Sequence, residues 1–170
     1  MIHWPAEGYV EAYLEMEKLQ KEGLTRSIGV SNFRKSHFQN LLSKVHIVPS
    51  INQIETNPQM VDEETIQYCK ENKIGVEAWS PLGSGACLNN PKIQEIANKY
   101  QKSSAQIILR WLLQKGIVIL PKSVYENRIK ENIDLFNFVL ENEDVELINQ
   151  LNQHKRTGPD PDNFDFRRQS

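Results

Sequence analysis

Residues 103–123 read SSAQIILRWLLQKGIVILPKS and contain, in order, the signals of a helix, a turn and a buried strand. Ser103 and Gln106 have the spacing of a capping box, and apolar residues follow at helical intervals. Gly116 is placed to end this helix, because glycine readily adopts the left-handed conformation found there. Residues 117–120 are apolar at every position, which is typical of a strand covered on both faces. The stretch therefore predicts a helix that leads into a strand of a parallel sheet.

The same alternation extends along the rest of the chain. Apolar runs of strand length occur at residues 27–30, 50–54 and 74–79. Helical signals separate and follow these runs: an apolar residue at every third position from Val10 to Leu19 before Gly23, Asp62 as an N-cap before two glutamates, and an amphipathic segment at 141–152. Strands that alternate with helices predict an α/β fold with a parallel sheet.

Two architectures fit this pattern, an open doubly wound sheet and a (β/α)8 barrel. No GxGxxG follows a strand, which disfavours a doubly wound dinucleotide-binding fold. Polar residues stand at the carboxyl ends of the strands: Ser31, Asn32, Gln53, Ser80, Lys122 and Ser123. Barrels build their sites at this edge, although open sheets bind ligands there as well. Four strands are found where a complete barrel needs eight.

Composition excludes several classes of protein. The chain of 170 residues has a formal net charge of −2, with acidic and basic residues interspersed, so nucleic acid is not an expected partner. No apolar run approaches the roughly 18 residues that cross a bilayer, so no membrane association is expected. Cys69 and Cys87 lack the spacing and the neighbours of a metal site, which predicts reduced thiols, a cytoplasmic location and no metal.

Five motifs at the strand ends resemble those of the aldo-keto reductase family, in the family's order. They are HWP at 3–5, IGVSNF at 28–33, NQIE at 52–55, AWSPLG at 78–83, and LPKS at 120–123 with NRIKEN at 127–132. The resemblance covers essentially the whole chain and is closest to bacterial members that reduce glyoxal and methylglyoxal. It implies a partial TIM barrel that runs from the end of strand four through strand eight and the C-terminal helices. Residues 1–170 are then expected to be the C-terminal portion of one barrel domain, without strands one to three and most of strand four.

The resemblance also implies an enzyme, an oxidoreductase that uses NADPH to reduce small aldehydes and ketones, including dicarbonyls such as methylglyoxal, to alcohols. His3 matches the family's catalytic histidine, which orients the substrate carbonyl, and Trp4 matches a residue that lines the substrate pocket. The family's tyrosine acid, its lysine and its aspartate all precede strand four. None of the five tyrosines of this chain lies in a matching context.

Lys122, Ser123 and Arg128 together can hold a phosphate monoester. Lysine supplies a point charge, arginine a two-pronged donor and serine a neutral donor. From the residues alone, an exposed basic face at a helix start is the alternative interpretation. The resemblance favours the 2′-phosphate of NADP.

The remaining expected cofactor contacts come only from the resemblance, which assigns them by part of the cofactor. They are Glu131 and Asn132 for adenine, Trp79 for the nicotinamide ring, Ser31, Asn32 and Gln53 for its carboxamide, and Ser80, Leu82 and Ser84 for the pyrophosphate.

Two other interpretations stay open, an NADP-binding module without turnover and a truncated, inactive fragment. An incomplete barrel exposes strand edges and inward-facing apolar side chains, which predicts self-association through those edges. The segment at 158–166 is expected, by resemblance, to help wall the pocket of a small carbonyl substrate.

Overall fold

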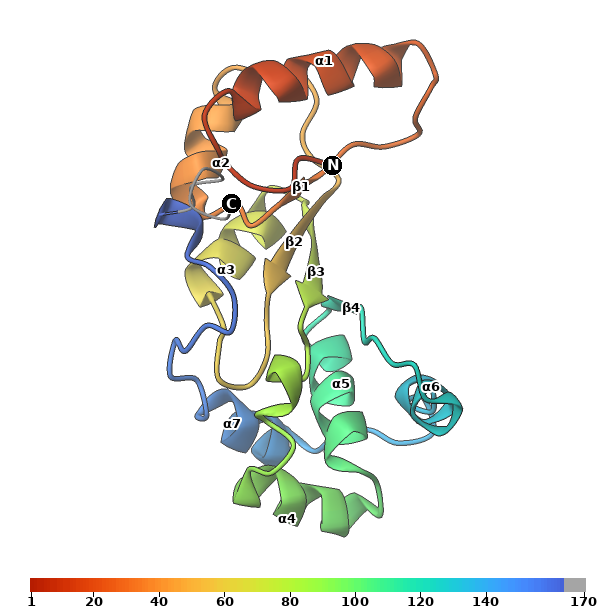
Figure 1. Cartoon of the computed structure of the whole chain (residues 1–170). Helices are drawn as coiled ribbons and strands as arrows, with labels where there is room; N and C mark the ends of the chain where they lie inside the picture. Colours follow the sequence, from red (N-terminus) through yellow and green to blue (C-terminus); the bar gives the residue numbers. More distant parts are fainter. Residues whose placement is uncertain (164–170) are drawn as a thin grey trace. The chain divides into compact units, whose positions relative to one another are not determined.

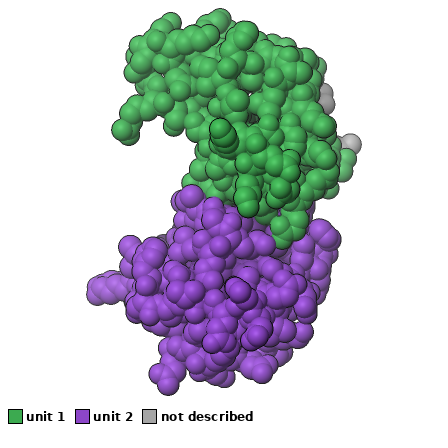
Figure 2. Space-filling model, turned by 180° about the vertical axis from the view of Figure 1, so that it is seen from behind, with its two compact units in different colours: residues 1–54, 63–77, 158–170 green, residues 55–62, 78–157 purple. Residues whose placement is uncertain are grey.

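The structure is a computed structural model that describes residues 1–163 (Figure 1). The chain divides into two compact units (Figure 2). The first contains residues 1–54, 63–77 and the described part of 158–170, and the second contains residues 55–62 and 78–157. Of the segment predicted to wall a pocket, residues 164–166 lie outside the described residues.

The first unit is built on parallel strands with helices between them. Its elements are α1 (Tyr9–Lys21), β1 (Val30–Ser31), α2 (Lys35–Leu42), most of β2 (Ile51–Glu55), α3 (Glu63–Glu71), most of β3 (Gly75–Trp79) and the short helix η2 (Pro161–Asn163). The last residue of β2 and the last two residues of β3 belong to the second unit. In the register of β1 and β2, Val30 lies opposite Asn52 and Ser31 lies opposite Gln53. β3 follows β2, and Gly75 N donates to Ser50 O over 3.0 Å at its start.

The core of the first unit contains a cluster of aromatic side chains. Phe33 and Phe38 are fully buried with ring centroids 5.7 Å apart, and Phe38 stacks on Tyr68 across α2 and α3. Glu17 is a buried carboxylate, and it accepts hydrogen bonds from His46 N and Ile47 N over 2.7 Å each. Those two donors offset the cost of burying the charge and fix the segment that leads to β2.

The second unit packs helices around α5. Its further elements are the short helix η1 (Gly83–Gly85), α4 (Pro91–Tyr100), α5 (Ser104–Gln114), β4 (Val118–Ile119), α6 (Glu126–Ile133) and α7 (Asn142–Asn149). Leu120 N donates to Ala78 O over 3.3 Å, which places β4 beside the end of β3 and completes the order β1-β2-β3-β4. α5 is buried on most of its surface, whereas α6 buries none of its residues.

The predicted parallel α/β sheet is confirmed, as is the capping box that begins α5. Ser103 Oγ accepts from Gln106 N over 3.2 Å, and Gln106 Oε1 accepts from Ser103 N over 3.0 Å. Gly116 has a φ of 74°, as its place after the helix requires.

Three elements differ from the sequence-based expectation. The strand predicted at 27–30 lies at Val30–Ser31, because Ile28 and Gly29 bond to neighbouring segments without forming a continuous ladder. Helices α2 and α4 were not predicted, although Asn90 followed by Pro91 is a recognisable helix start. Among the helices of residues 1–163, none combines the length and apolarity needed to cross a bilayer.

Candidate functional site

A cavity of about 770 Å³ in the second unit brings most of the predicted phosphate-binding residues together. It is lined by the loop after β3, by α4, by the start of α5, and by the segment from β4 into α6. Eight predicted residues line it: Ser80, Leu82, Ser84, Lys122, Ser123, Arg128, Glu131 and Asn132. Sequence reasoning missed other polar residues that share the lining, namely Asn89, Gln94, Ser103 and Ser104.

Lys122 and Arg128 give the cavity its positive charge. Within the described residues, neither side chain forms an ion pair with a carboxylate, so both charges face solvent and the cavity. The Arg128 guanidinium lies 4.7 Å from the centroid of the Tyr125 ring, an arrangement that restrains the plane of the guanidinium. Ser123 Oγ accepts from Tyr125 N over 3.1 Å and shapes the turn that starts α6.

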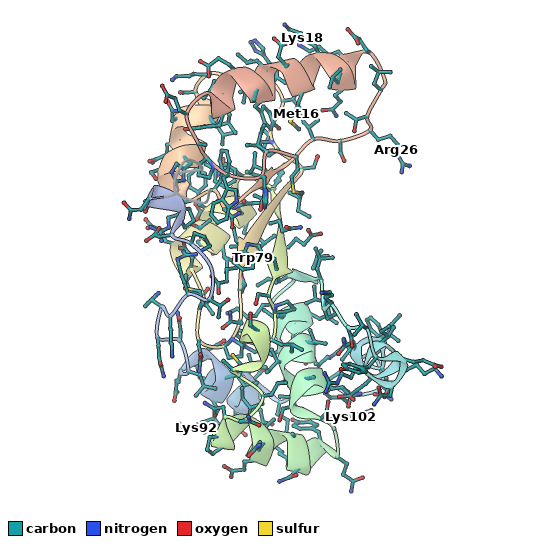
Figure 3. The ribbon with its side chains drawn as sticks, viewed as in Figure 1. Met16, Lys18, Arg26, Trp79, Lys92 and Lys102 are labelled. Atoms are coloured by element: carbon teal, nitrogen blue, oxygen red, sulfur yellow. The ribbon has the colours of Figure 1, made fainter. Side chains whose placement is uncertain are left out.

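The far end of α6 is tied to the start of α5 by polar contacts. Ser103 Oγ donates to Glu131 Oε1, and Lys102 Nζ forms an ion pair with Asp134 Oδ2 over 3.0 Å. Gln106 Nε2 donates to the backbone oxygen of Asp134 over 2.8 Å. Figure 3 shows Lys102 at the start of α5. Because α6 buries no residue, these contacts set its position.

The loop after β3 has an unusual backbone. Ser80 and Ser84 have φ values of 50° and 53°, which non-glycine residues rarely adopt. Ser84 N donates to Ser80 Oγ over 3.2 Å, so the two predicted pyrophosphate-binding serines contact each other directly. Such strained backbone is concentrated at ligand sites, where the surrounding structure enforces it.

Trp79 ends β3 immediately before this loop (Figure 3) and does not line the cavity. Its backbone oxygen accepts from Thr56 N over 3.4 Å. The side chain is neither fully buried nor fully exposed, which leaves part of its ring surface open to contact.

In the first unit, the structure brings together the three residues assigned to the carboxamide. Ser31 Oγ donates to Gln53 O over 2.8 Å, and Asn32 Nδ2 donates to Ser31 Oγ over 3.1 Å. Asn32 Nδ2 also reaches the backbone oxygen of His3 over 3.0 Å. Gln53 Nε2 donates to the Glu77 carboxylate, a partner that sequence reasoning missed. These bonds fix three polar groups and the His3 backbone in one network.

His3 is exposed, and Trp4 beside it is buried with 8% of its surface accessible. Their ring centroids are 5.8 Å apart and the rings are tilted by 44°. An exposed imidazole next to an indole can donate a hydrogen bond to a carbonyl oxygen while the indole provides an apolar wall.

Tyr13 and Tyr100, two of the five tyrosines, have raised pKa values. Burial raises the pKa of Tyr13, with a smaller contribution from the Glu17 carboxylate. Tyr100 Oη donates to Asp144 Oδ2 over 2.6 Å and its pKa is raised, first by burial and then by that bond. Both shifts weaken these phenols as acids. Among residues 1–163, no group of three His, Cys, Asp or Glu side chains stands close enough to hold a metal ion.

Comparison with known proteins agrees with this geometry. The chain is 51% identical to the uncharacterized oxidoreductase YtbE and 47% identical to glyoxal reductase, both from Bacillus subtilis, over 98% of its own length. The methylglyoxal reductase DkgA of Escherichia coli is 44% identical over 96% of the chain. The chain spans about 60% of the length of these relatives.

Solved structures give the same result. The crystal structure of Gox0644 in its apo form superposes with a TM-score of 0.94 at 39% identity, over 97% of this chain and 62% of that one. An aldo-keto reductase of Bombyx mori in complex with NADP gives a TM-score of 0.86 at 39% identity, over 95% of this chain and 59% of that one. The model of the Aldo/keto reductase family matches residues 1–153. The chain therefore belongs to the aldo/keto reductase family.

Proposed function

We propose that the protein is an NADPH-dependent oxidoreductase that reduces small aldehydes and ketones, dicarbonyls such as methylglyoxal among them, to alcohols. The observation that carries this proposal is the cavity of the second unit, where Lys122, Ser123 and Arg128 converge. The names of the glyoxal and methylglyoxal reductases, and the NADP complex of the Bombyx mori protein, support the same reading.

The residues of the cavity fit the 2′-phosphate of NADPH. Two cations without acidic partners in the described chain balance the nearly double negative charge of a phosphate monoester. Ser123 adds a neutral donor beside them. We assign the pyrophosphate to the loop after β3, with Ser80, Leu82 and Ser84, and adenine to Glu131 and Asn132, as the resemblance predicts. When bound, the cofactor supplies the hydride.

For the reacting end, we assign Trp79 to the nicotinamide ring, and Ser31, Asn32 and Gln53 to its carboxamide. An indole offers broad contact area with little conformational entropy to lose, which suits a flat ring. His3 is assigned to the substrate carbonyl, where its imidazole donates a hydrogen bond, and Trp4 to the pocket wall.

We further propose that β1–β4 are part of a (β/α)8 barrel, the portion from the end of strand four onward. Around β4 and α6 large apolar side chains are exposed, including Leu120, Ile133 and Phe136 with 47%, 72% and 75% of their surface accessible. Apolar surface of this extent favours self-association. The two free cysteines suit a cytoplasmic location.

The test has two stages. Binding of NADPH and of NADH to the purified chain is measured by fluorescence titration, and NADPH absorbance is then followed with methylglyoxal, glyoxal and simple aldehydes. Tighter binding of NADPH than NADH together with carbonyl-dependent oxidation supports the proposal. Binding without oxidation, in this chain and in longer forms of the protein, indicates a binding module, and failure to bind either cofactor overturns the assignment.

A further inference from the structure

A buried polar cluster, whose residues do not line the cavity, contacts the loop after β3. Cys87 and Asn57 are 0% and 1% exposed, and both belong to the second unit. Cys87 Sγ donates to Asn57 Oδ1 over 3.6 Å, a normal length for a hydrogen bond from sulfur. Asn57 Oδ1 also accepts from Gln59 N over 3.0 Å.

Gly83 brings the backbone of the loop directly onto this cluster. A Cβ atom at Gly83 would stand 2.8 Å from Cys87 Sγ and 3.4 Å from Asn57 Cγ, which leaves no room for a side chain. The φ of 58° at Gly83 also favours glycine. The thiol and the carboxamide are therefore the surface on which the loop rests.

The hydrogen bonds that orient the Asn57 side chain all reach its amide oxygen. The Gln59 N–H can only donate, so the atom that faces it must be the amide oxygen. Asn57 Nδ2 has no hydrogen-bond acceptor within residues 1–163. Two donors thus hold the side chain, and Cys87 is one of them. The Asn57 backbone is paired in both directions with Met60, over 3.0 and 2.9 Å, so the platform itself is firm.

The loop has hydrogen bonds of its own, from Gly83 N to Ser80 O over 2.9 Å and from Gly85 N to Leu82 O over 3.0 Å, but its backbone is strained. Ser80, Gly83 and Ser84 all have positive φ, and two of these residues are not glycine. Conformations of this kind persist only where neighbouring structure enforces them. Burial raises the pKa of the Cys87 thiol, which keeps the group in the neutral form that can donate a hydrogen bond.

We propose that Cys87 is a positioning residue of the cofactor site: through Asn57 and Gly83 it holds the loop of Ser80–Gly85 in the conformation that lines the cavity. The inference rests on the proposed function, since it takes that loop to contact the pyrophosphate of NADPH. Substitution of such a residue lowers the affinity for ligands that contact the loop. It leaves unchanged the affinity for ligands that are bound by Lys122 and Arg128 alone.

The first experiment compares two probes on Cys87→Ala, Cys87→Ser and the control Cys69→Ala, a second fully buried thiol in α3 of the first unit. NADPH carries the pyrophosphate, whereas adenosine 2′-monophosphate carries only the 2′-phosphate. Cys87→Ala should weaken the binding of NADPH roughly three- to tenfold, as loss of one hydrogen bond ordinarily does, and should leave the affinity for the monophosphate unchanged. Cys87→Ser, which keeps a donor, should restore most of the affinity.

Equal weakening of both probes, or equal effects of Cys87→Ala and Cys69→Ala, would overturn the proposal, because both outcomes mark general destabilisation. Unchanged NADPH binding in folded Cys87→Ala overturns it as well. If the wild-type chain binds neither probe, the proposed function fails, and a second measurement then decides the inference alone.

That measurement is the rate at which iodoacetamide alkylates each thiol, read by mass spectrometry without cofactor. Asn57→Ala removes the acceptor beneath Gly83 and should speed alkylation of Cys87 while the rate at Cys69 stays constant. A rate at Cys87 that does not respond to Asn57→Ala shows that the hydrogen bond does not hold the loop.

Discussion

The Arg128 guanidinium lies 4.7 Å from the centroid of the Tyr125 ring. Tyr125, at the start of α6, therefore helps to orient the cationic side chain that lines the cavity. Both side chains are exposed, and an exposed cation–π contact is worth about 0.5–1 kcal/mol. Tyr125→Leu should therefore weaken the binding of adenosine 2′-monophosphate about two- to fivefold. Tyr125→Phe keeps the ring and should bind this ligand with the wild-type affinity. Calorimetric titration measures both, and equal affinity for the leucine and phenylalanine variants would show that the ring has no part in orienting Arg128.

Replacing the two cations of the cavity should change the choice of cofactor. Lys122→Ala and Arg128→Ala each remove a charged donor, which is worth roughly tenfold or more in affinity, and only NADP carries the 2′-phosphate that uses it. Affinity for NADP should fall while affinity for NAD stays nearly constant. The control is Lys130→Ala, on the same helix, whose ammonium pairs with Glu126 over 2.7 Å and does not line the cavity. An equal decrease in the affinities for NADP and NAD would show that Lys122 and Arg128 do not bind the 2′-phosphate.

Ser103 has two structural tasks, as N-cap of α5 and as donor to Glu131 on α6. Ser103→Ala should lower the free energy of unfolding by about 1 kcal/mol or more, since loss of an N-cap alone typically costs that amount. The neighbouring Ser104→Ala serves as control, because Ser104 stands inside the first turn, where alanine is well tolerated. Urea unfolding measures both variants, and the same midpoint for the two would contradict the capping role.

The parallel sheet and the start of α5 could be predicted because their signals are local. A capping box, a helix-ending glycine and an apolar run lie within residues 103–123, so no distant contact is needed to read them. Helix α2 was not predicted, because the residue at its N-cap is Arg34 and not one of the usual capping residues Ser, Thr, Asp or Asn. Arg34 N donates instead to the ring of His37 over 3.1 Å, and histidine at that position is not a usual helix-start signal.

The candidate site residues were predicted from motifs, whereas their hydrogen-bond partners were not predicted. Gln53 bonds to Glu77 and Ser103 bonds to Glu131, pairs that are 24 and 28 residues apart in the sequence. Neither pair leaves a local pattern, because both exist only after strands and helices have packed. The same holds for Cys87, which the sequence identified only as a reduced thiol, and whose bond to Asn57 spans 30 positions.

The stability of the first unit should decrease as the solution becomes mildly acidic, through His37. Burial lowers the pKa of this imidazole below its ordinary 6.5, and the Arg34 guanidinium lowers it further, against the opposing effect of the Asp162 carboxylate 3.6 Å away. The unfolded chain therefore binds the proton more readily than the folded chain. The stabilisation is complete above about pH 6.5 and is lost progressively as the pH falls below that value.

His37→Gln removes the titrating group and should flatten the dependence of the unfolding free energy on pH just below neutrality. His46→Gln, at an exposed position, is the matched control and should keep the wild-type slope. Urea unfolding at a series of pH values between 5 and 8, roughly the range in which histidine titrates, supplies the comparison. A slope of opposite sign, with stability rising as the pH falls, would mean that attraction to Asp162 outweighs burial, and the carboxylate rather than desolvation would then control this histidine.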